Sequence, residues 1–182
     1  MKVTPSPGLP DVLRLEMSEY RDDRGSFAEM FNAREFAKAT GVDSTFVQDN
    51  YSSSNRNVIR GLHYQIDRAQ GKLVWVVRGE LFDVAVDLRR SSPTFGRWTG
   101  QRLSEGNKTV LWIPPGFAHG FLSLSDGAGI LYKTTDFYSP LHERCVSWND
   151  PDLAIDWPVS GTPIVSERDR RGVAFKDAET YP

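Results

Sequence analysis

Residues 72–88 read KLVWVVRGELFDVAVDL, and this stretch decides the fold class that the sequence predicts. Its first part, Lys72–Val77, is rich in β-branched and aromatic residues and ends at Arg78-Gly79, a turn signal. Its second part, Glu80–Leu88, alternates with a period of two. The fully apolar face of that alternation holds Phe82, Val84, Val86 and Leu88. The pattern predicts two strands joined as an antiparallel hairpin.

Short apolar runs separated by glycine and proline continue on both sides of this stretch. Further strands are predicted at Thr45–Asn50, Val58–Gln65, Arg97–Leu103, Thr109–Ile113, Phe117–Ser123 and Gly129–Asp136. Regular strands at this spacing are typical of a sandwich or barrel. We therefore predict an all-β protein, a double-sheet jelly-roll β-barrel.

A few short helices are expected at the periphery. Asn32 is a suitable N-cap, and Glu35, three residues later, is a capping-box partner. Phe36 supplies an apolar contact for this helix, and Gly41 ends it. A second short helix is expected after Ser166.

The bulk composition describes one globular domain over residues 1–182, without repeats or low-complexity tracts. The net charge of −2 gives no general attraction to nucleic acid or to anionic membranes, so a local cation cluster must hold any anionic ligand. Cys145 is the single cysteine and cannot form an internal disulfide, which favours a reducing compartment. No apolar run approaches the length of a membrane span. We expect a cytoplasmic protein that binds neither nucleic acid nor membrane.

Motifs for metal and cofactor chemistry are missing from the sequence. The three histidines, His63, His119 and His142, form neither an H-x-H pair nor an H-E-x-x-H motif, and there is no C-x-x-C. The G-x-S-x-G, P-loop and dinucleotide glycine fingerprints are absent as well. We expect no metal and no bound cofactor.

Polar and aromatic residues share faces of the predicted strands. Strict alternation puts His63 with Gly61 and Gln65, opposite Arg60, Leu62 and Tyr64. Gln48 and Asn50 share a face, as do Tyr132, Thr134, Asp136 and, if that strand continues, Tyr138. Inward polar faces line a pocket, and histidine, lysine and tyrosine together suit proton transfer. The spacing alone favours hydrogen-bonded packing residues and a solvated Lys72 over a catalytic set, and it identifies no substrate.

Several segments along nearly the whole chain resemble the dTDP-4-dehydrorhamnose 3,5-epimerase family. The most distinctive is IPPGFAHGF at 113–121. The others, in order, are DRGSFAE at 23–29, FVQDN at 46–50, VIRGLHYQ at 58–65, QGKLV at 70–74, DVAVDLR at 83–89, SPTFG at 92–96, YK at 132–133, YSP at 138–140, WND at 148–150 and IDWP at 155–158. One such motif is weak evidence, whereas this many in order at the family's spacing are strong evidence.

The resemblance implies a cupin-type homodimer that converts dTDP-4-dehydro-6-deoxy-glucose to dTDP-4-dehydro-rhamnose. It implies His63 as general base, oriented by Asp169, and Tyr132 as general acid. Lys72 is expected to support the oxyanion, and Tyr138 to stack on the nucleotide base.

The resemblance also implies a set of binding residues. These are Arg24, Phe27, Glu29, Gln48, Asp49, Asn50, Arg60, His119, Tyr138, Glu143 and Arg168. Of these, Arg24, Phe27 and Glu29 are expected to reach the neighbouring subunit on a swapped N-terminal segment. Arg168 departs from a frequent lysine but keeps the cation that a phosphate contact needs.

Three alternative functions can be weighed against this pattern. An epimerase that inverts only carbon 3 or only carbon 5 would use the same His63–Tyr132 pair. A catalytically silent cupin that binds sugar nucleotides would need neither a base nor an acid. A metal-dependent cupin oxygenase conflicts with the histidine spacing.

Overall fold

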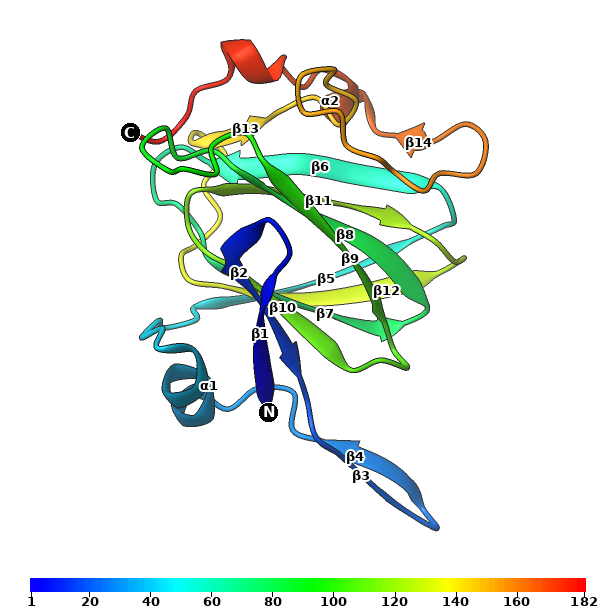
Figure 1. The fold of residues 1–182 in the computed structure, drawn as a ribbon. Coiled ribbons are helices and arrows are strands. Elements are labelled where there is room, and N and C mark those ends of the chain that lie inside the picture. Colours follow the sequence, from blue (N-terminus) through cyan, green and yellow to red (C-terminus); the bar gives the residue numbers. More distant parts are fainter.

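The computed structural model describes residues 1–182 as two packed β-sheets with short helices at their edges (Figure 1). None of these helices combines the length and apolar character that crossing a membrane requires. The elements are β1 Lys2–Ser6, β2 Leu9–Glu16, β3 Glu19–Asp22, β4 Gly25–Ala28, α1 Ala33–Thr40, β5 Gln48–Ser54, β6 Val58–Gln65, β7 Lys72–Arg78, β8 Glu80–Asp87, β9 Trp98–Ser104, β10 Thr109–Ile113, β11 Phe117–Ser123, β12 Ala128–Thr134, β13 Glu143–Cys145, β14 Ile164–Val165, α2 Glu167–Arg170 and the 3₁₀ turn η1 Phe175–Asp177.

The strands form two main sheets and one separate hairpin. The first sheet has the order β1-β2-β10-β7-β12-β5, and the second has the order β13-β6-β11-β8-β9. All neighbours within these orders are antiparallel, and β14 adds a parallel pair to β6. The β3–β4 hairpin projects away from both sheets (Figure 1). The predicted all-β double-sheet architecture is confirmed.

Three apolar clusters hold the layers together. The first lies between the sheets and includes Val74 and Ile130 from one sheet with Ala85 and Phe121 from the other. The second covers the outer face of the second sheet with side chains of the C-terminal segment, such as Trp157. The third lies between α1 and the outer face of the first sheet. Both sheets are therefore buried on two faces over much of their area, which fixes their positions and leaves the pocket walls rigid.

The predicted hairpin between β7 and β8 is wrong. Strand β7 pairs with β10 and β12 in the first sheet, whereas β8 pairs with β11 and β9 in the second. Only Gly79 separates the two strands, and its φ of 72° lies in the left-handed region that glycine adopts readily. Common hairpin loops need at least two residues. The turn at Gly79 therefore carries the chain from one sheet to the other.

Strand β8 is buried on both faces, not only on the apolar face that its alternation indicates. Val84 and Val86 pack in the outer cluster, while Leu81 and Ala85 pack between the sheets. Asp83 lies on the same inner face and is completely buried. A buried carboxylate needs hydrogen-bond partners, and Asp83 finds one in a histidine of β11, described below.

The predicted positions of both helices are confirmed, but Glu35 makes no capping-box hydrogen bond to Asn32, and the strand predictions need additions. The side chain of Asn32 accepts hydrogen bonds from the first turn of α1, and Gly41 ends the helix. The N-terminal strands β1 to β4 were not predicted, and β5 runs to Ser54 because all seven of its residues pair with β12. Strand β12 ends at Thr134, so Tyr138 lies in a loop and not on a continued strand.

Candidate active site

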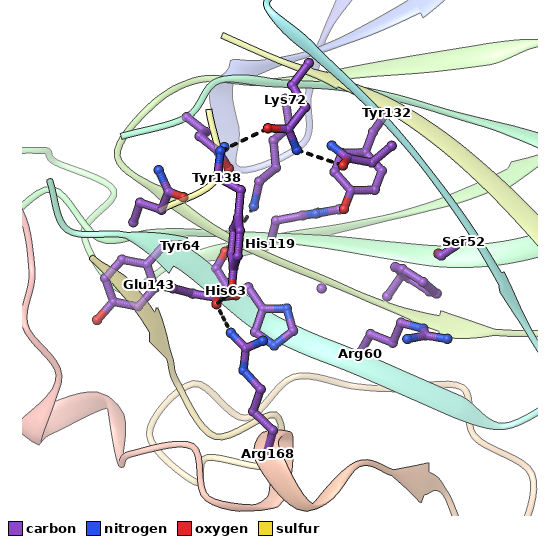
Figure 2. Close-up of a pocket in the computed structure, with 16 residues that line it drawn as sticks. Ser52, Arg60, His63, Tyr64, Lys72, His119, Tyr132, Tyr138, Glu143 and Arg168 are labelled. Atoms are coloured by element: carbon purple, nitrogen blue, oxygen red, sulfur yellow. Dashed lines mark hydrogen bonds and ion pairs between the residues drawn. The ribbon is translucent and has the colours of Figure 1, made fainter. Parts of the chain in front are cut away.

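A pocket of about 350 Å³ opens between the two sheets (Figure 2). Strands β5, β7 and β12 of the first sheet form one wall, and β6, β11 and β13 of the second sheet form the other. Its lining is mostly polar and consists of Gln48, Asn50, Ser52, Arg60, His63, Tyr64, Gln65, Gln70, Lys72, His119, Gly120, Phe121, Tyr132, Tyr138, Glu143 and Arg168. Polar side chains that face inward between two sheets depart from the apolar packing of a core, and they therefore indicate a binding site.

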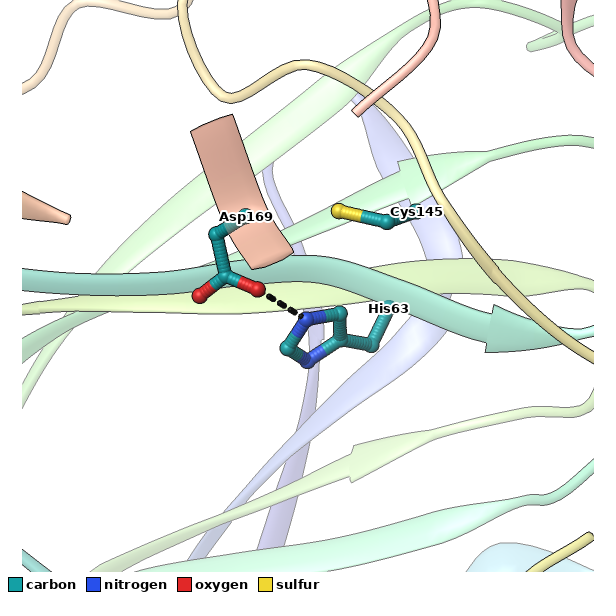
Figure 3. A group of neighbouring side chains, drawn as sticks. All are labelled: His63, Cys145 and Asp169. Atoms are coloured by element: carbon teal, nitrogen blue, oxygen red, sulfur yellow. Dashed lines mark hydrogen bonds and ion pairs between the residues drawn. The ribbon is translucent and has the colours of Figure 1, made fainter. Parts of the chain in front are cut away.

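The first functional group of the pocket is a histidine–aspartate pair (Figure 3). The Nε2 atom of His63 lies 2.7 Å from Oδ1 of Asp169, a residue of α2 (Figure 3). Burial alone raises the pKa of the Asp169 carboxyl, but the contacts with His63, the Gly61 N–H and Ser166 outweigh burial and lower it. Asp169 is therefore ionised at neutral pH. It fixes the imidazole tautomer with the proton on Nε2 and leaves Nδ1 as the free acceptor.

The second functional group is a buried lysine beside a second histidine–aspartate pair. Burial lowers the pKa of Lys72 to about 8, while the nearby Asp83 carboxylate raises it. Lys72 is thus still a cation at neutral pH. His119 directs Nε2 at both oxygens of Asp83, at 3.0 and 2.9 Å. The floor of the pocket therefore holds one cation and a histidine of fixed orientation.

The third functional group is Tyr132, which enters from β12 in the opposite sheet to His63 (Figure 2). Burial raises the pKa of its phenol, and the charge of Arg60 offsets part of that effect. The phenol is therefore protonated at neutral pH and is able to donate a proton. An imidazole and a protonated phenol thus line the same pocket from two walls.

A bulge in β6 places Arg60 in the pocket together with His63. In the pairing with β11, His63 lies opposite His119 and Arg60 lies opposite Phe121. Between these two pairs, β6 has one residue more than β11. Strict alternation predicts Arg60 and His63 on opposite faces of β6. The extra residue shifts the alternation, so both side chains face the pocket. Close approach of the strands accompanies it: a Cβ on Gly61 would lie 2.6 Å from the His119 carbonyl oxygen.

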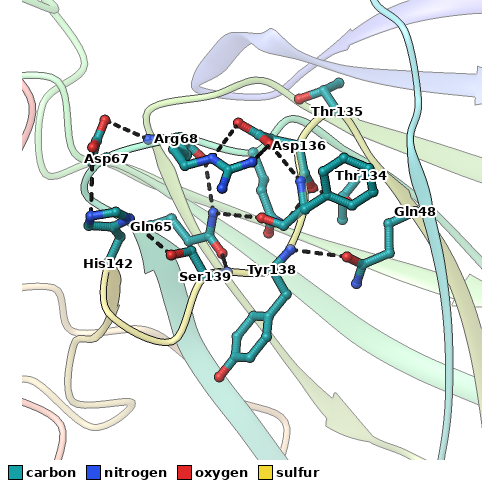
Figure 4. Close-up of polar contacts among 12 residues, drawn as sticks. Gln48, Gln65, Asp67, Arg68, Thr134, Thr135, Asp136, Tyr138, Ser139 and His142 are labelled. Carbon is teal, nitrogen blue, oxygen red and sulfur yellow. Dashed lines mark hydrogen bonds and ion pairs between the residues drawn. The ribbon is translucent and has the colours of Figure 1, made fainter.

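Tyr138 reaches the pocket from a loop that glutamine side chains hold in place (Figure 4). Gln48 Oε1 accepts a hydrogen bond from the Tyr138 N–H at 3.0 Å. Gln65 Oε1 accepts from the Ser139 N–H at 2.7 Å, and its Nε2 donates to the carbonyls of Arg68 at 2.8 Å and Phe137 at 3.3 Å. Gln65 is 3% exposed. The backbone on both sides of Tyr138 is therefore fixed from within the site.

At the pocket mouth, Tyr138 joins a chain of charged groups. Its hydroxyl donates to Glu143 Oε2 at 2.6 Å, and the same oxygen forms an ion pair with Arg168. Arg168 belongs to α2, the helix that also carries Asp169. The rim thus offers one aromatic face and one guanidinium close together.

The structure brings most of the predicted site residues together. The pocket contains His63, Lys72, Tyr132, Gln48, Asn50, Arg60, His119, Tyr138, Glu143 and Arg168, and Asp169 lies directly behind His63. Asp49 lies on the outer face of β5, where it pairs with Lys133 at 2.7 Å. Arg24 and Phe27 lie on the β3–β4 hairpin, and Glu29 follows it. These four residues do not line the pocket of this chain.

Sequence reasoning missed several contributors to the site. Asp83 orients His119, and Gln65 and Gln70 hold the Tyr138 loop, where Gln70 Nε2 donates to the Asp136 carbonyl at 2.8 Å. The isolated aspartate in the apolar β8 run was a usable signal for Asp83. The side chains of His63, Cys145 and Asp169 also place possible metal-ligand atoms within 4.8 Å of one another.

Comparison with known proteins gives a consistent picture. A family model described as dTDP-4-dehydrorhamnose 3,5-epimerase matches residues 7–177. The protein of that name from Pseudomonas aeruginosa is 60% identical over 96% of both chains. The crystal structure of a dTDP-6-deoxy-D-glucose-3,5-epimerase from Legionella pneumophila, in complex with dTDP-4-keto-L-rhamnose, is 44% identical with a TM-score of 0.95, covering 98% of this chain and 94% of that one. A dTDP-4-dehydrorhamnose 3-epimerase from Streptomyces niveus is 39% identical, over 94% of this chain and 83% of its own.

Proposed function

Because the chain belongs to the dTDP-4-dehydrorhamnose 3,5-epimerase family, we propose that it converts dTDP-4-dehydro-6-deoxy-glucose to dTDP-4-dehydro-rhamnose. One observation carries this proposal beyond the family likeness. His63 with its aspartate, the Lys72 cation and the Tyr132 phenol all converge on one pocket. These are the base, the charge stabiliser and the acid that inversion beside a ketone requires.

The reaction begins with removal of a proton next to the ketone at carbon 4. Protons on carbons 3 and 5 are both α to this ketone, and removal of either gives an enolate. His63 takes the proton through Nδ1, the ring nitrogen that the hydrogen bond to Asp169 leaves free. The carboxylate of Asp169 stabilises the imidazolium that forms. Lys72 stabilises the negative charge that develops on the ketone oxygen. Without this stabilisation, the α proton is too weakly acidic for a neutral histidine to remove at a useful rate.

Inversion is completed when the enolate carbon receives a proton on its opposite face. Tyr132 lies on the wall across from His63, and its raised phenol pKa keeps that proton available at neutral pH. The phenol gives its proton to the carbon and regains one from solvent, while His63 releases its proton before the next cycle. No redox change occurs in this scheme.

The remaining pocket residues suit a nucleotide diphosphate. Arg60 and Arg168 supply two guanidinium groups, which match phosphate oxygens in bidentate geometry. Tyr138 offers an exposed ring at the pocket mouth for the thymine, and such stacking contributes about 1–3 kcal/mol per base. Gln48, Asn50, His119 and Glu143 provide further hydrogen-bonding groups.

The assembly in this proposal is a homodimer in the cytoplasm. The β3–β4 hairpin exposes two large rings, Tyr20 at 67% and Phe27 at 68%, which is unfavourable for an isolated chain. In the proposed dimer, Arg24, Phe27 and Glu29 reach the neighbouring subunit's site. The single Cys145 requires no oxidising compartment.

The decisive experiment is incubation with dTDP-4-dehydro-6-deoxy-glucose, a dTDP-4-dehydro-rhamnose reductase and a nicotinamide cofactor. We expect dTDP-rhamnose to form with the wild type. The His63→Ala variant should remain folded and bind dTDP but lose nearly all turnover. If His63→Ala kept most of the activity, the assignment of the base would be wrong.

A mono-epimerase is the second candidate, since the Streptomyces niveus relative is named as a 3-epimerase. Incubation in deuterated water, followed by NMR, separates the two functions. Exchange at both carbon 3 and carbon 5 supports the double epimerase, and exchange at one carbon supports the mono-epimerase. Exchange at neither carbon would indicate a protein that only binds the sugar nucleotide.

A further inference from the structure

Three side chains with different donor atoms meet behind the pocket wall (Figure 3). They are His63 of β6, Cys145 of β13 and Asp169 of α2. One ring nitrogen, the sulfur and one carboxylate oxygen all lie within 4.8 Å of one another. The scheme above uses the histidine and the aspartate but gives no role to the thiol.

The backbone holds these donors close before any ligand arrives. Cys145 and His63 are directly opposed in the β13–β6 pairing, so their side chains leave neighbouring points of the sheet. Next to this pair, Leu62 and Val146 exchange two backbone hydrogen bonds of 3.1 and 3.0 Å. Asp169 is fixed by the short helix that Ser166 caps. Ordering the cluster around an ion therefore costs little conformational entropy.

The donor set matches a thiophilic divalent cation. Imidazole nitrogen, thiolate sulfur and carboxylate oxygen are the usual ligands of Zn²⁺, at about 2.0–2.3 Å from the metal. Donor atoms of a tetrahedral site then lie roughly 3.3–3.8 Å apart. The widest donor separation, within 4.8 Å, must therefore contract by about 1 Å at most, and the 2.7 Å contact between His63 and Asp169 must open by about 0.6 Å. The thiolate and the carboxylate also balance the two positive charges. The neighbouring cation Arg168 is already paired with Glu143.

We propose that His63, Cys145 and Asp169 form a Zn²⁺-binding site that inhibits the enzyme; the inhibitory consequence rests on the proposed role of His63. The ion takes the place of the proton between His63 Nε2 and the Asp169 carboxylate. That proton moves to Nδ1, and the thiol proton of Cys145 is released to solvent. An imidazole with metal on Nε2 and hydrogen on Nδ1 has no lone pair for a substrate proton.

The thiol enters this site as a neutral group. Burial, together with the Asp169 carboxylate, raises the pKa of Cys145 to about 12. A coordinating cation deprotonates such a thiol outright. His63 is 29% exposed on its side chain, so the fourth metal position is open to water from the pocket.

Cobalt provides a direct test that does not depend on turnover. Co²⁺ is added to the reduced full-length protein in the absence of substrate, with a phosphine reductant that binds the metal weakly. We expect a thiolate-to-cobalt charge-transfer band in the near ultraviolet for the wild type and its loss in Cys145→Ser. Absence of the band in the wild type, or its persistence in Cys145→Ser, would overturn the site.

Inhibition by Zn²⁺ is the second measurement. Zn²⁺ should inhibit the wild type reversibly, with recovery on chelation. Cys145→Ser should keep the activity measured without metal and need at least about tenfold more Zn²⁺ for equal inhibition. His142→Gln removes the histidine near Asp67 and should keep wild-type sensitivity to Zn²⁺. Equal inhibition of wild type and Cys145→Ser would refute the assignment.

Two further controls keep these outcomes separate. Cys145→Ala replaces Cys145→Ser if the serine variant does not fold, and the wild-type cobalt spectrum remains decisive in either case. A cobalt band in a protein without epimerase activity would support the metal site and reject the proposed function. Epimerase activity in a protein that gives no cobalt band would support the proposed function and reject the metal site.

Discussion

The Nζ atom of Lys72 donates a hydrogen bond to the main-chain carbonyl of His63, 3.2 Å away. This contact bridges β7 of one sheet and β6 of the other, across the inner end of the pocket. The cation to which we assign stabilisation of the enolate is thereby held at a fixed distance from the strand that carries the proposed base. Preorganised charge of this kind needs no rearrangement during the reaction.

Replacing Lys72 by methionine removes the charge and keeps most of the volume. We expect turnover to fall by roughly a hundred- to a thousand-fold, because loss of one oxyanion stabiliser has this typical effect. The loss should appear in kcat, measured with the coupled reductase assay, with a much smaller change in KM. A variant defective only in KM would show that Lys72 acts in binding and not on the oxyanion.

The pH dependence of turnover follows from the same lysine. Burial lowers the Lys72 pKa from 10.5 to about 8, so the cation is lost as pH rises through about 8. Activity should therefore decline above that pH. The raised pKa of Tyr132 rules out its ionisation as the cause. The arginine of Lys72→Arg keeps its charge above pH 8, so the residual activity of this variant should lack the decline. If Lys72→Arg showed the same pH profile as the wild type, the decline would belong to another group.

Changing Asp169 to asparagine tests the orientation of His63. The amide keeps the shape but stabilises neither the imidazolium nor the tautomer with the proton on Nε2. We expect kcat to fall at least about a hundred-fold, while dTDP affinity and thermal stability stay close to those of the wild type. Calorimetric titration with dTDP and a melting curve provide these controls. Near-normal kcat would contradict the pairing's catalytic role.

Tyr132→Phe separates proton removal from proton return. Without the phenol, His63 still removes the α proton and returns solvent hydrogen to the same face. We expect exchange in deuterated water to persist while the epimerised product falls more strongly, as measured by NMR on one sample. An equal fall of exchange and epimerisation would exclude Tyr132 as the specific acid.

Gln65→Leu tests the attachment of the Tyr138 loop. The substitution leaves the Ser139 N–H and two carbonyls without their partner, at a typical cost of about 1–3 kcal/mol. We expect roughly tenfold weaker dTDP binding, because Tyr138 loses its fixed position. Gln101→Leu on β9 is the matched control and should bind normally. Normal dTDP affinity in Gln65→Leu would show that the loop holds its place without this glutamine.

Much of the site was predictable because it lies on strands with clear patterns. His63, Lys72 and Tyr132 each belong to a strand that was predicted within one or two residues. Their convergence followed from the family likeness, since alternation alone fixes a face but not which faces meet. The helix at Asn32–Gly41 was predictable because its capping residues act locally.

The errors arose where tertiary contacts override the local pattern. Nothing in Arg78-Gly79 distinguishes a hairpin from a crossing between sheets; the choice depends on which strands already occupy the edges of β7. The polar end of β5 resembles a loop but is held by β12. Tyr138 follows a strand that ends early. Its position depends on hydrogen bonds to the distant residues Gln48 and Gln65, and no local pattern indicates those contacts.

The bulge in β6 makes the pocket sensitive to the number of residues as well as to their identity. Removing one residue between Arg60 and His63 would restore simple pairing with β11 and turn one of these side chains out of the cavity. A point substitution elsewhere on the strand leaves that geometry in place. Insertions and deletions in this segment should thus be far less tolerated during divergence than exchanges of side chains.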